Sequence, residues 1–295
     1  MLVSEVIDRT LNTWLYPAGV NRPSFDILAS TVDADTLTLT VEQRVTIPRD
    51  SILEIGSELV LTEESLAGTI TAAERGYLDT VPAAHSAGAR VYLDPMFSRK
   101  TIFDTLCTVV GELYPAGVYR RTIDDSTVTW TTGAAVALPS GTGQVLKATV
   151  VRAYTSPADY VRLRPERGEY EVLYEFDPPK IKLVSGGYSG AQVIVVVAKD
   201  FTLPTDETKD LTTVCGIPAS LVPHLPLAIA GNILQSRELP RIMVEEVRRL
   251  LASQGVEVGA AVNVGQVLLN LFTRKVDAER RRLAQLDPLV FEMSE

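Results

Sequence analysis

The sequence has few of the residues on which metal centres and many enzymes depend. Its 295 residues include two cysteines and two histidines. Two thiols in a chain of this length favour a reducing compartment over a disulfide scaffold. His85 lies in a connection of small residues and is interpreted as a turn histidine that bonds the local backbone rather than as a catalytic residue. His224 has no histidine or cysteine at metal-ligand spacing beside it, so a cap or packing explains it better than a metal site.

Long apolar runs and targeting signals are also lacking. No apolar run approaches the ~20 residues that cross a bilayer, and the N-terminus lacks the regions of a signal peptide. The glycine-rich turns are not followed by Gly-Lys-Ser/Thr, and no Gly-x-Ser-x-Gly elbow is present. We therefore expect a soluble protein that is made in the cytoplasm, binds no membrane, metal or cofactor, and is not an enzyme.

Negative charge prevails in the sequence. The formal net charge is −9, with 46% hydrophobic and 22% charged residues, which is typical of a folded acidic protein. Such a chain does not attract nucleic acid through its overall field. One arginine cluster, at Arg152, Arg162, Arg164 and Arg167, lies in the middle of the chain.

Residues near the C-terminus form a second basic cluster. Asp277 and Glu279 are interleaved with it, so it is either a solvated helix face or a surface that matches an acidic protein partner. Because no aromatic residues alternate with these cations, a nucleic-acid contact is less favoured. The cluster consists of Arg274, Lys275, Arg280, Arg281 and Arg282.

Hydrophobic periodicity divides the chain into helical and strand-like stretches. Apolar residues recur every three or four positions over 3–16, 98–114 and 221–286, with breaks near Pro240 and Gly255. Ser98 is the candidate N-cap of the second helical stretch, and Pro115 ends it. Short runs of period two occupy 34–95, where they predict strands at 36–41, 59–61, 69–71 and 90–93, and 123–202. The unbroken apolar run at 193–197 predicts a strand in the interior of its sheet.

These stretches predict an α+β protein built on a helical bundle. The bundle would comprise 1–30, 96–120 and 205–295, with a small β module inserted at 31–95 and a larger antiparallel sandwich or barrel at 121–204. A module of that size has a marginal core, so we expect it to lean on the helices. The hexapeptide Leu-Tyr-Pro-Ala-Gly-Val occurs at 15–20 and at 113–118. It marks either two independent helix ends or two helices that pair in the bundle.

One motif resembles a known family. Residues 74–80 read Glu-Arg-Gly-Tyr-Leu-Asp-Thr, residues 82–89 read Pro-Ala-Ala-His-Ser-Ala-Gly-Ala, and residues 94–99 read Asp-Pro-Met-Phe-Ser-Arg. Together they resemble an Arg-Gly-aromatic-Gly-Thr … Ala-Ala-His … Gly-Ala pattern in structural proteins of tailed bacteriophages. Asp79 stands where that pattern has glycine, so the turn there is expected to differ.

The resemblance is to head-to-tail adaptors, also called connector or head-completion proteins. It implies a virion protein at the neck, between capsid and tail, that forms a ring of about twelve copies. The implied partners are further copies of the chain, the portal protein, and tail or neck proteins. Genomic DNA would pass through the ring without specific binding. The motif is that of a structural turn and carries no catalytic residue.

Two surfaces are candidates for partner binding. One is the C-terminal basic cluster, and the other is an apolar tail that we expect to dock on the portal or on a neighbouring copy, consisting of Leu289, Val290, Phe291 and Met293. The alternative function is a tail-associated protein that binds a receptor or a carbohydrate. Its aromatic platform, unless these residues simply pack between strands, would consist of Trp130, Tyr154, Tyr160, Tyr170, Tyr174 and Tyr188.

Overall fold

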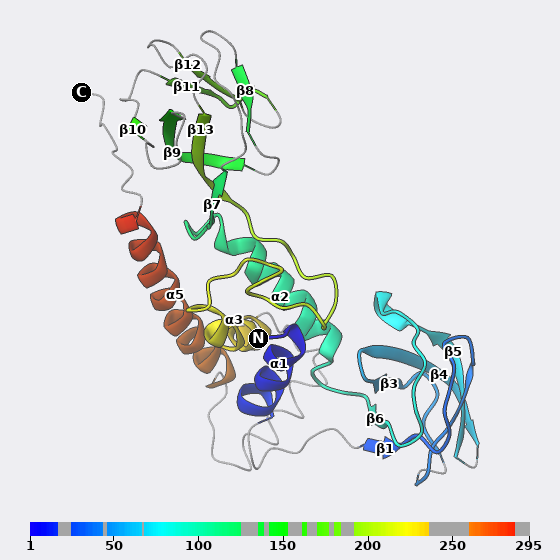
Figure 1. Cartoon of the computed structure of the whole chain (residues 1–295). Coiled ribbons are helices and arrows are strands. Elements are labelled where there is room, and N and C mark those ends of the chain that lie inside the picture. Colours follow the sequence, from blue (N-terminus) through cyan, green and yellow to red (C-terminus); the bar gives the residue numbers. More distant parts are fainter. Residues whose placement is uncertain are drawn as a thin grey trace. The chain divides into compact units, whose positions relative to one another are not determined.

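The computed structural model divides the chain into two compact units (Figure 1). The first comprises Met1–Val109, Asp206–Thr208 and Pro223–Phe272, and the second comprises Val110–Thr205, Lys209–Val222 and Thr273–Glu295. The structure describes residues 1–16, 25–43, 46–66, 68–124, 135–138, 142–152, 161–163, 170–176, 180–183, 192–235 and 260–286. Over these ranges, no helix combines the length and apolarity that a bilayer crossing requires.

A curled antiparallel sheet dominates the first unit. Its six strands follow the order β1-β6-β3-β4-β5-β2. The two edges are joined where Ala29 N–H donates to the Thr40 carbonyl at 2.7 Å and Glu42 N–H donates to the Ile27 carbonyl at 3.0 Å. The sheet therefore curls towards a barrel. The strands are β1 (Phe25–Ile27), β2 (Thr38–Thr40), β3 (Ile52–Ile55), β4 (Glu58–Leu66), β5 (Thr69–Arg75) and β6 (Arg90–Leu93).

The curled sheet encloses its own core. Alternate residues of its strands point inward, and a fully buried Leu or Ile side chain contributes about 1.5–3 kcal/mol. The sheet therefore does not depend on the helices for its apolar interior. The buried cluster comprises Leu28, Val32, Leu39, Val41, Ile47, Leu53, Ile55, Val60, Ile70, Ala72 and Val91.

The described helices are α1 (Val3–Arg9), α2 (Arg99–Leu113), α3 (Leu225–Gln235) and α5 (Ala260–Leu286). The π-helical turn η1 (Thr10–Leu15) continues α1, and the 3-10 turn η3 (Val222–His224) precedes α3. The Ser98 hydroxyl accepts the Thr101 N–H at 3.1 Å, which confirms the predicted N-cap of α2. Where α3 meets α5, a Cβ on Gly231 would lie 2.8 Å from the Leu269 side chain, so this close approach requires glycine.

The described strands of the second unit form two antiparallel sheets. Their orders are β10-β9-β13-β7 and β11-β12-β8. β13 lies between β9 and β7, so the predicted interior position of the run at 193–197 is confirmed. The strands are β7 (Arg120–Asp124), β8 (Ala135–Ala137), β9 (Thr142–Arg152), β10 (Val161–Leu163), β11 (Tyr170–Leu173), β12 (Lys180–Leu183) and β13 (Gln192–Lys199).

The predicted fold class is wrong. The described residues form thirteen strands in three antiparallel sheets against four α-helices, and the curled sheet is not a small insert in a helical bundle. The prediction missed β1, which lies in the stretch assigned to the helical bundle, and β3, whose sequence Ile-Leu-Glu-Ile does not alternate between apolar and polar residues. It also underestimated the core of this sheet, because β1 pairs with β6 across a long stretch of sequence.

The hypothesis that the two helices pair stays a prediction. α1 and η1 pack on α3, and Asp8 of α1 bonds Arg99 of α2. The second copy of the hexapeptide simply ends α2, because Gly117 adopts φ of +84° and the Val118 N–H donates to the Leu113 carbonyl at 3.0 Å. Residues 17–20 of the first copy and the short helix predicted at 242–251 lie outside the described residues.

Candidate functional site

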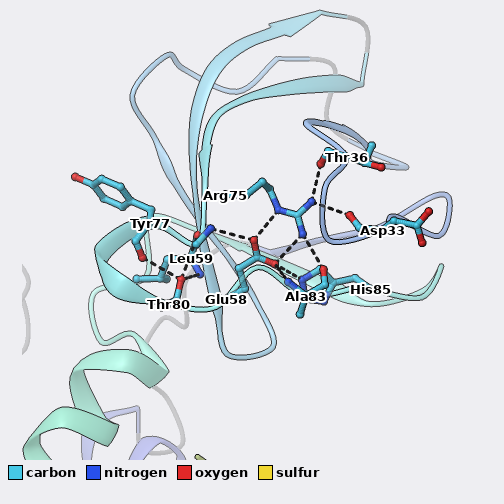
Figure 2. A network of polar contacts seen from close by, with 10 residues as sticks. Asp33, Thr36, Glu58, Leu59, Arg75, Tyr77, Thr80, Ala83 and His85 are labelled. Carbon is cyan, nitrogen blue, oxygen red and sulfur yellow. Dashed lines mark hydrogen bonds and ion pairs between the residues drawn. The ribbon is translucent and has the colours of Figure 1, made fainter.

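The phage-like motif folds into a buried polar network on the curled sheet (Figure 2). Glu58 is the first residue of β4, Arg75 is the last residue of β5, and His85 lies between the 3-10 turn η2 (Tyr77–Asp79) and β6. The Glu58 side chain is 0% exposed and that of Arg75 is 4% exposed. A buried charged pair is stable only when its remaining donors and acceptors are also bonded.

The Arg75 guanidinium uses all of its donors. Nε donates to Glu58 Oε1 at 2.6 Å, and Nη2 donates to Glu58 Oε2 at 2.8 Å. Nη2 also donates to the Ala83 carbonyl at 2.8 Å. Nη1 donates to the carbonyls of Asp33 at 3.1 Å and Thr36 at 2.6 Å. Because a guanidinium has five N–H groups, Arg75 is saturated and ties two loops to the end of β5.

Glu58 is saturated as well. Besides Arg75, it accepts the Gly76 N–H at 3.2 Å and the Ala83 N–H at 3.1 Å, and it lies 2.7 Å from His85 Nε2. Burial alone would raise the pKa of Glu58, but the hydrogen bonds from Arg75, His85 and Ala83 outweigh it and hold the pKa below its usual range. The His85 imidazole thus bonds a distant carboxylate and not the local backbone that the sequence suggested.

Gly76 makes the network possible. Its φ is +68°, and a Cβ there would lie 2.6 Å from the Thr80 carbonyl oxygen and 2.7 Å from Cδ of Pro82. The Thr80 hydroxyl accepts the Leu59 N–H at 3.0 Å, which fixes the same turn to β4. Asp79, the residue that departs from the phage pattern, adopts φ of +60°. The motif therefore encodes a strained, internally bonded turn, in which the charged groups of Glu58 and Arg75 are fully engaged.

A second polar cluster lies at the start of α2, around Arg99. The Arg99 backbone N–H donates to Glu54 Oε1 on β3. Its guanidinium donates to Glu207 at 2.6 Å and to Asp8 of α1 at 2.5 Å. The Glu207 carbonyl in turn accepts the Ser4 N–H at 3.0 Å. This cluster connects β3, α1 and the segment around Glu207 to the beginning of α2.

Glu54 is the titratable group of this cluster. Burial raises its pKa to about 7, although the Arg99 N–H and charge partly oppose the shift. Its carboxyl lines a pocket of about 320 Å³. Nine side chains line this pocket, and they include a second carboxylate, two tyrosines and two arginines besides Glu54. They are Asp8, Leu11, Asn12, Tyr16, Glu54, Arg90, Tyr92, Phe97 and Arg99.

The predicted basic cluster lies on the last part of α5, and all five of its side chains are exposed. Two of them bond within the chain. Arg282 holds the buried carboxylate of Glu279 at 2.6 Å, which also accepts the Ser220 hydroxyl at 3.0 Å. Arg280 pairs with Asp277 at 3.3 Å. With the described residues, Arg274, Lys275 and Arg281 form no ion pair, so they are the free part of the predicted surface.

Other predicted site residues are only partly covered by the structure. Leu289, Val290, Phe291 and Met293 lie outside the described residues, as do Arg164 and Arg167. Of the aromatic platform, Tyr174 is 52% exposed. Trp130, Tyr154, Tyr160 and Tyr188 lie outside the described residues, and nothing is described of the Tyr170 side chain. Within the described ranges, no group of three or more His, Cys, Asp or Glu residues could hold a metal ion.

Sequence reasoning missed Glu54 and Glu58. The available signal was a glutamate directly before the apolar run Leu59-Val60-Leu61 at the start of a strand. A charged residue on the inner side of a strand is rarely buried without a partner. The motif supplied that partner in Arg75, but the pairing spans 17 positions and no pattern in the sequence indicates it.

The chain has little detectable similarity to known proteins. No family model matches the chain, and no curated protein matches it. One solved structure, the regulatory domain of Toxoplasma gondii PKA with cAMP, matches with 11% identity and a TM-score of 0.13. The match covers 66% of this chain and 88% of that one, and at this score it supports no inference about fold or function.

Proposed function

We propose that the chain is a structural protein of a tailed-phage virion, namely a head-to-tail adaptor that forms a ring and joins the portal to the tail. The observation that carries this proposal is the structure that the phage-like motif adopts. Arg75, Gly76 and His85 belong to a saturated internal network with Glu58, as expected of a motif that defines a scaffold. A motif that bound substrate would instead leave donors or acceptors directed at a ligand.

The proposal includes the absence of catalysis and a set of partners. Further copies of the chain, the portal, and tail or neck proteins would contact its surfaces, while genomic DNA would pass through the ring. A net charge of −9 supports this last point, because an acidic channel wall repels the duplex and lets it slide. The protein would be made in the host cytoplasm and reside in the neck of the virion.

The test is the mass of the purified chain alone and mixed with its portal protein, measured by native mass spectrometry. An adaptor is expected to form a closed ring of about twelve copies, alone or on the portal. A chain that remains monomeric in both conditions contradicts the proposal. An unrelated phage's portal serves as the control for nonspecific adhesion.

A tail-associated receptor- or carbohydrate-binding protein is the alternative. It is favoured by Tyr174 and Phe176, which are 52% and 41% exposed beside β11. Exposed aromatic rings are a common platform for sugars, but Lys180 lies over the Phe176 ring at 4.0 Å, which partly accounts for its position. Saturable glycan binding by the full chain that Tyr174→Ala abolishes would favour the alternative over the adaptor.

A further inference from the structure

The charges of this chain are distributed unevenly over its described surfaces. Between residues 25 and 94, the exposed described cations are Arg49 and Arg90. Many more carboxylates are exposed over the same stretch, so the outside of the curled sheet is strongly acidic. These are Asp33, Asp35, Glu42, Asp50, Glu63, Glu64, Glu74, Asp79 and Asp94.

The last part of α5 has the opposite character. Phe272, Val276, Glu279 and Leu283 are buried, and their spacing of three and four residues defines the inward side of the helix. Arg274, Lys275 and Arg281 lie on the outward side, where Arg274 and Arg281 are two turns apart, about 10 Å. We call these three residues the basic face of α5.

The neighbouring cations do not belong to this face. Arg282 is held by Glu279, and the stem of Arg280 packs so closely on Gly117 that a Cβ there would lie 3.0 Å from Arg280 Cδ. The basic face is therefore a defined subset of the cluster. It is fixed on a regular helix and has no ionic partner among the described residues.

The matching acidic surface is best defined on β4. Glu63 and Glu64 are both exposed, and Glu63 lies in a register irregularity of the β4–β5 pairing between Thr62 and Glu64. Glu63 has only a 3.9 Å contact with Arg49, and both side chains are largely exposed, so a stronger cationic partner can displace it. Next to them, Leu66 is 73% exposed and offers apolar area. We call Glu63, Glu64 and Leu66 the acidic end of β4.

We infer that the basic face of α5 in one copy docks on the acidic end of β4 in a second copy of this chain. The inference rests on the proposed function, because a ring requires each subunit to join two different surfaces. A contact between unlike surfaces is heterologous, and it closes into a ring when the rotation per copy divides a full turn. Complementary charges on the two surfaces fix the register of the contact and hasten the encounter.

The test reverses the charges on each surface in the full-length chain. The variants are Arg274→Glu with Arg281→Glu on α5, and Glu63→Lys with Glu64→Lys on β4. Each pair alone is expected to raise the apparent dissociation constant for self-association by at least about tenfold in sedimentation velocity, at about 0.1 M salt. The matched control, Arg9→Glu with Lys100→Glu, makes the same charge change on exposed or half-buried residues elsewhere and should assemble as the wild type does.

Mixing the two charge-reversed variants gives the decisive test. In a 1:1 mixture of the two reversed variants, each acidic helix can meet a basic strand and each basic helix an acidic one. The mixture should therefore assemble again in alternation, although neither variant assembles alone. Recovery in the mixture also shows that the variants are folded, which a loss of assembly by itself would not.

Several results would overturn the inference. One is a wild-type protein that stays monomeric. Another is self-association that is unchanged by both charge reversals or by about 1 M salt. The third is a mixture of the two reversed variants that does not assemble. Loss of duplex-DNA binding by the α5 variant with unchanged self-association would assign the basic face to DNA instead. Portal binding is measured in parallel. If the chain binds portal but ignores the reversals, only this inference fails, whereas a chain that neither binds portal nor self-associates also defeats the proposed function.

Discussion

Glu54 and Glu58 lie on either side of the β3–β4 turn and are 5% and 0% exposed, yet their pKa values move in opposite directions. Glu58 accepts hydrogen bonds from Arg75, Gly76, Ala83 and His85 inside one closed network. The described bond of Glu54 comes from the Arg99 backbone N–H, and the negative charge of Glu207 is close by. Burial therefore sets neither pKa alone, and the donors around each carboxylate decide the sign.

The two polar clusters also differ in what they connect. We call the Arg99 cluster the joint, because it links separate elements. The Glu58 network lies within the curled sheet and its connecting loops, so it holds one piece of structure together. The Arg99 cluster connects the sheet to α1 and α2, and its titratable group responds to pH near neutrality. Substitutions in the Glu58 network should consequently be costly at neutral pH and above. Those in the Arg99 cluster should be mild, or should change most between acidic and neutral pH.

The largest effect is expected for Glu58→Gln. The amide cannot neutralise Arg75, and its NH2 group meets N–H donors where the carboxylate had accepted them. Breaking a buried pair in this way costs about 3–5 kcal/mol, which we expect as a loss in the free energy of unfolding measured by urea denaturation. Loss of under about 1 kcal/mol would contradict the role given to the network.

Gly76→Ala should come next, at about 3–4 kcal/mol, because it combines a left-handed φ with a clash against the Thr80 carbonyl and Pro82. Gly56→Ala is the matched control. Gly56 has φ of +62° but nothing within 4 Å of the added Cβ, so only about 1–2 kcal/mol should be lost. Equal losses at the two positions would show that the close contact at Gly76 is unimportant.

Glu54→Gln should show an effect that depends on pH. A raised pKa means that the folded protein binds the proton more tightly than the unfolded chain, so wild-type stability falls as pH rises from about 4.5 to about 7. The glutamine mimics the protonated acid. The variant should be as stable as wild type below pH 4.5 and more stable by roughly 3 kcal/mol above pH 7, as measured by urea denaturation across pH.

The contribution of Glu58 to stability should depend on pH in the opposite direction. Because the pKa of Glu58 is depressed, its contribution is complete above the unfolded value and is lost as pH falls through the folded value. The wild type should therefore weaken further in acid below pH 4.5, and Glu58→Gln should remove that additional weakening. A Glu54→Gln difference that does not change with pH would remove the contrast between the two glutamates.

The smallest effect is expected for Tyr16→Phe, at the edge of the Glu54 pocket. The Phe97 N–H donates to the Tyr16 hydroxyl at 3.1 Å, and the two rings meet edge-on with centroids 5.2 Å apart. Removing the hydroxyl takes this acceptor from the buried Phe97 N–H and keeps the ring contact, so about 1–2 kcal/mol should be lost in urea denaturation. A loss as large as that of Glu58→Gln would mean that the joint is as rigid as the network.

Parts of the fold could be predicted from local signals. α2 was predicted within about one residue of its ends, because regular apolar spacing, the Ser98 cap and Pro115 all agree. β6 was predicted with the bounds it has. β1 and β3 were not, because β3 reads Ile-Leu-Glu-Ile without alternation and β1 forms by pairing with β6, far along the chain.

The candidate sites show the same limit. The sequence located the basic cluster of α5, since cations on a helix are visible one by one. It did not separate Arg282, which holds the buried Glu279, from Arg274 and Arg281, because that distinction depends on which side of the helix is covered. The Glu58 network likewise joins residues separated by 17 and 27 positions, and only the folded sheet brings them together.

The most direct test of the proposed role is the position of this chain in the assembled particle. Antibodies raised against the full-length protein, carrying a gold label, can be imaged on intact virions by electron microscopy, with particles lacking the protein as the control. An adaptor should place the label at the neck, between capsid and tail, on every particle. Label at the tips of tail fibres, or protein found only outside the particles, would contradict that role.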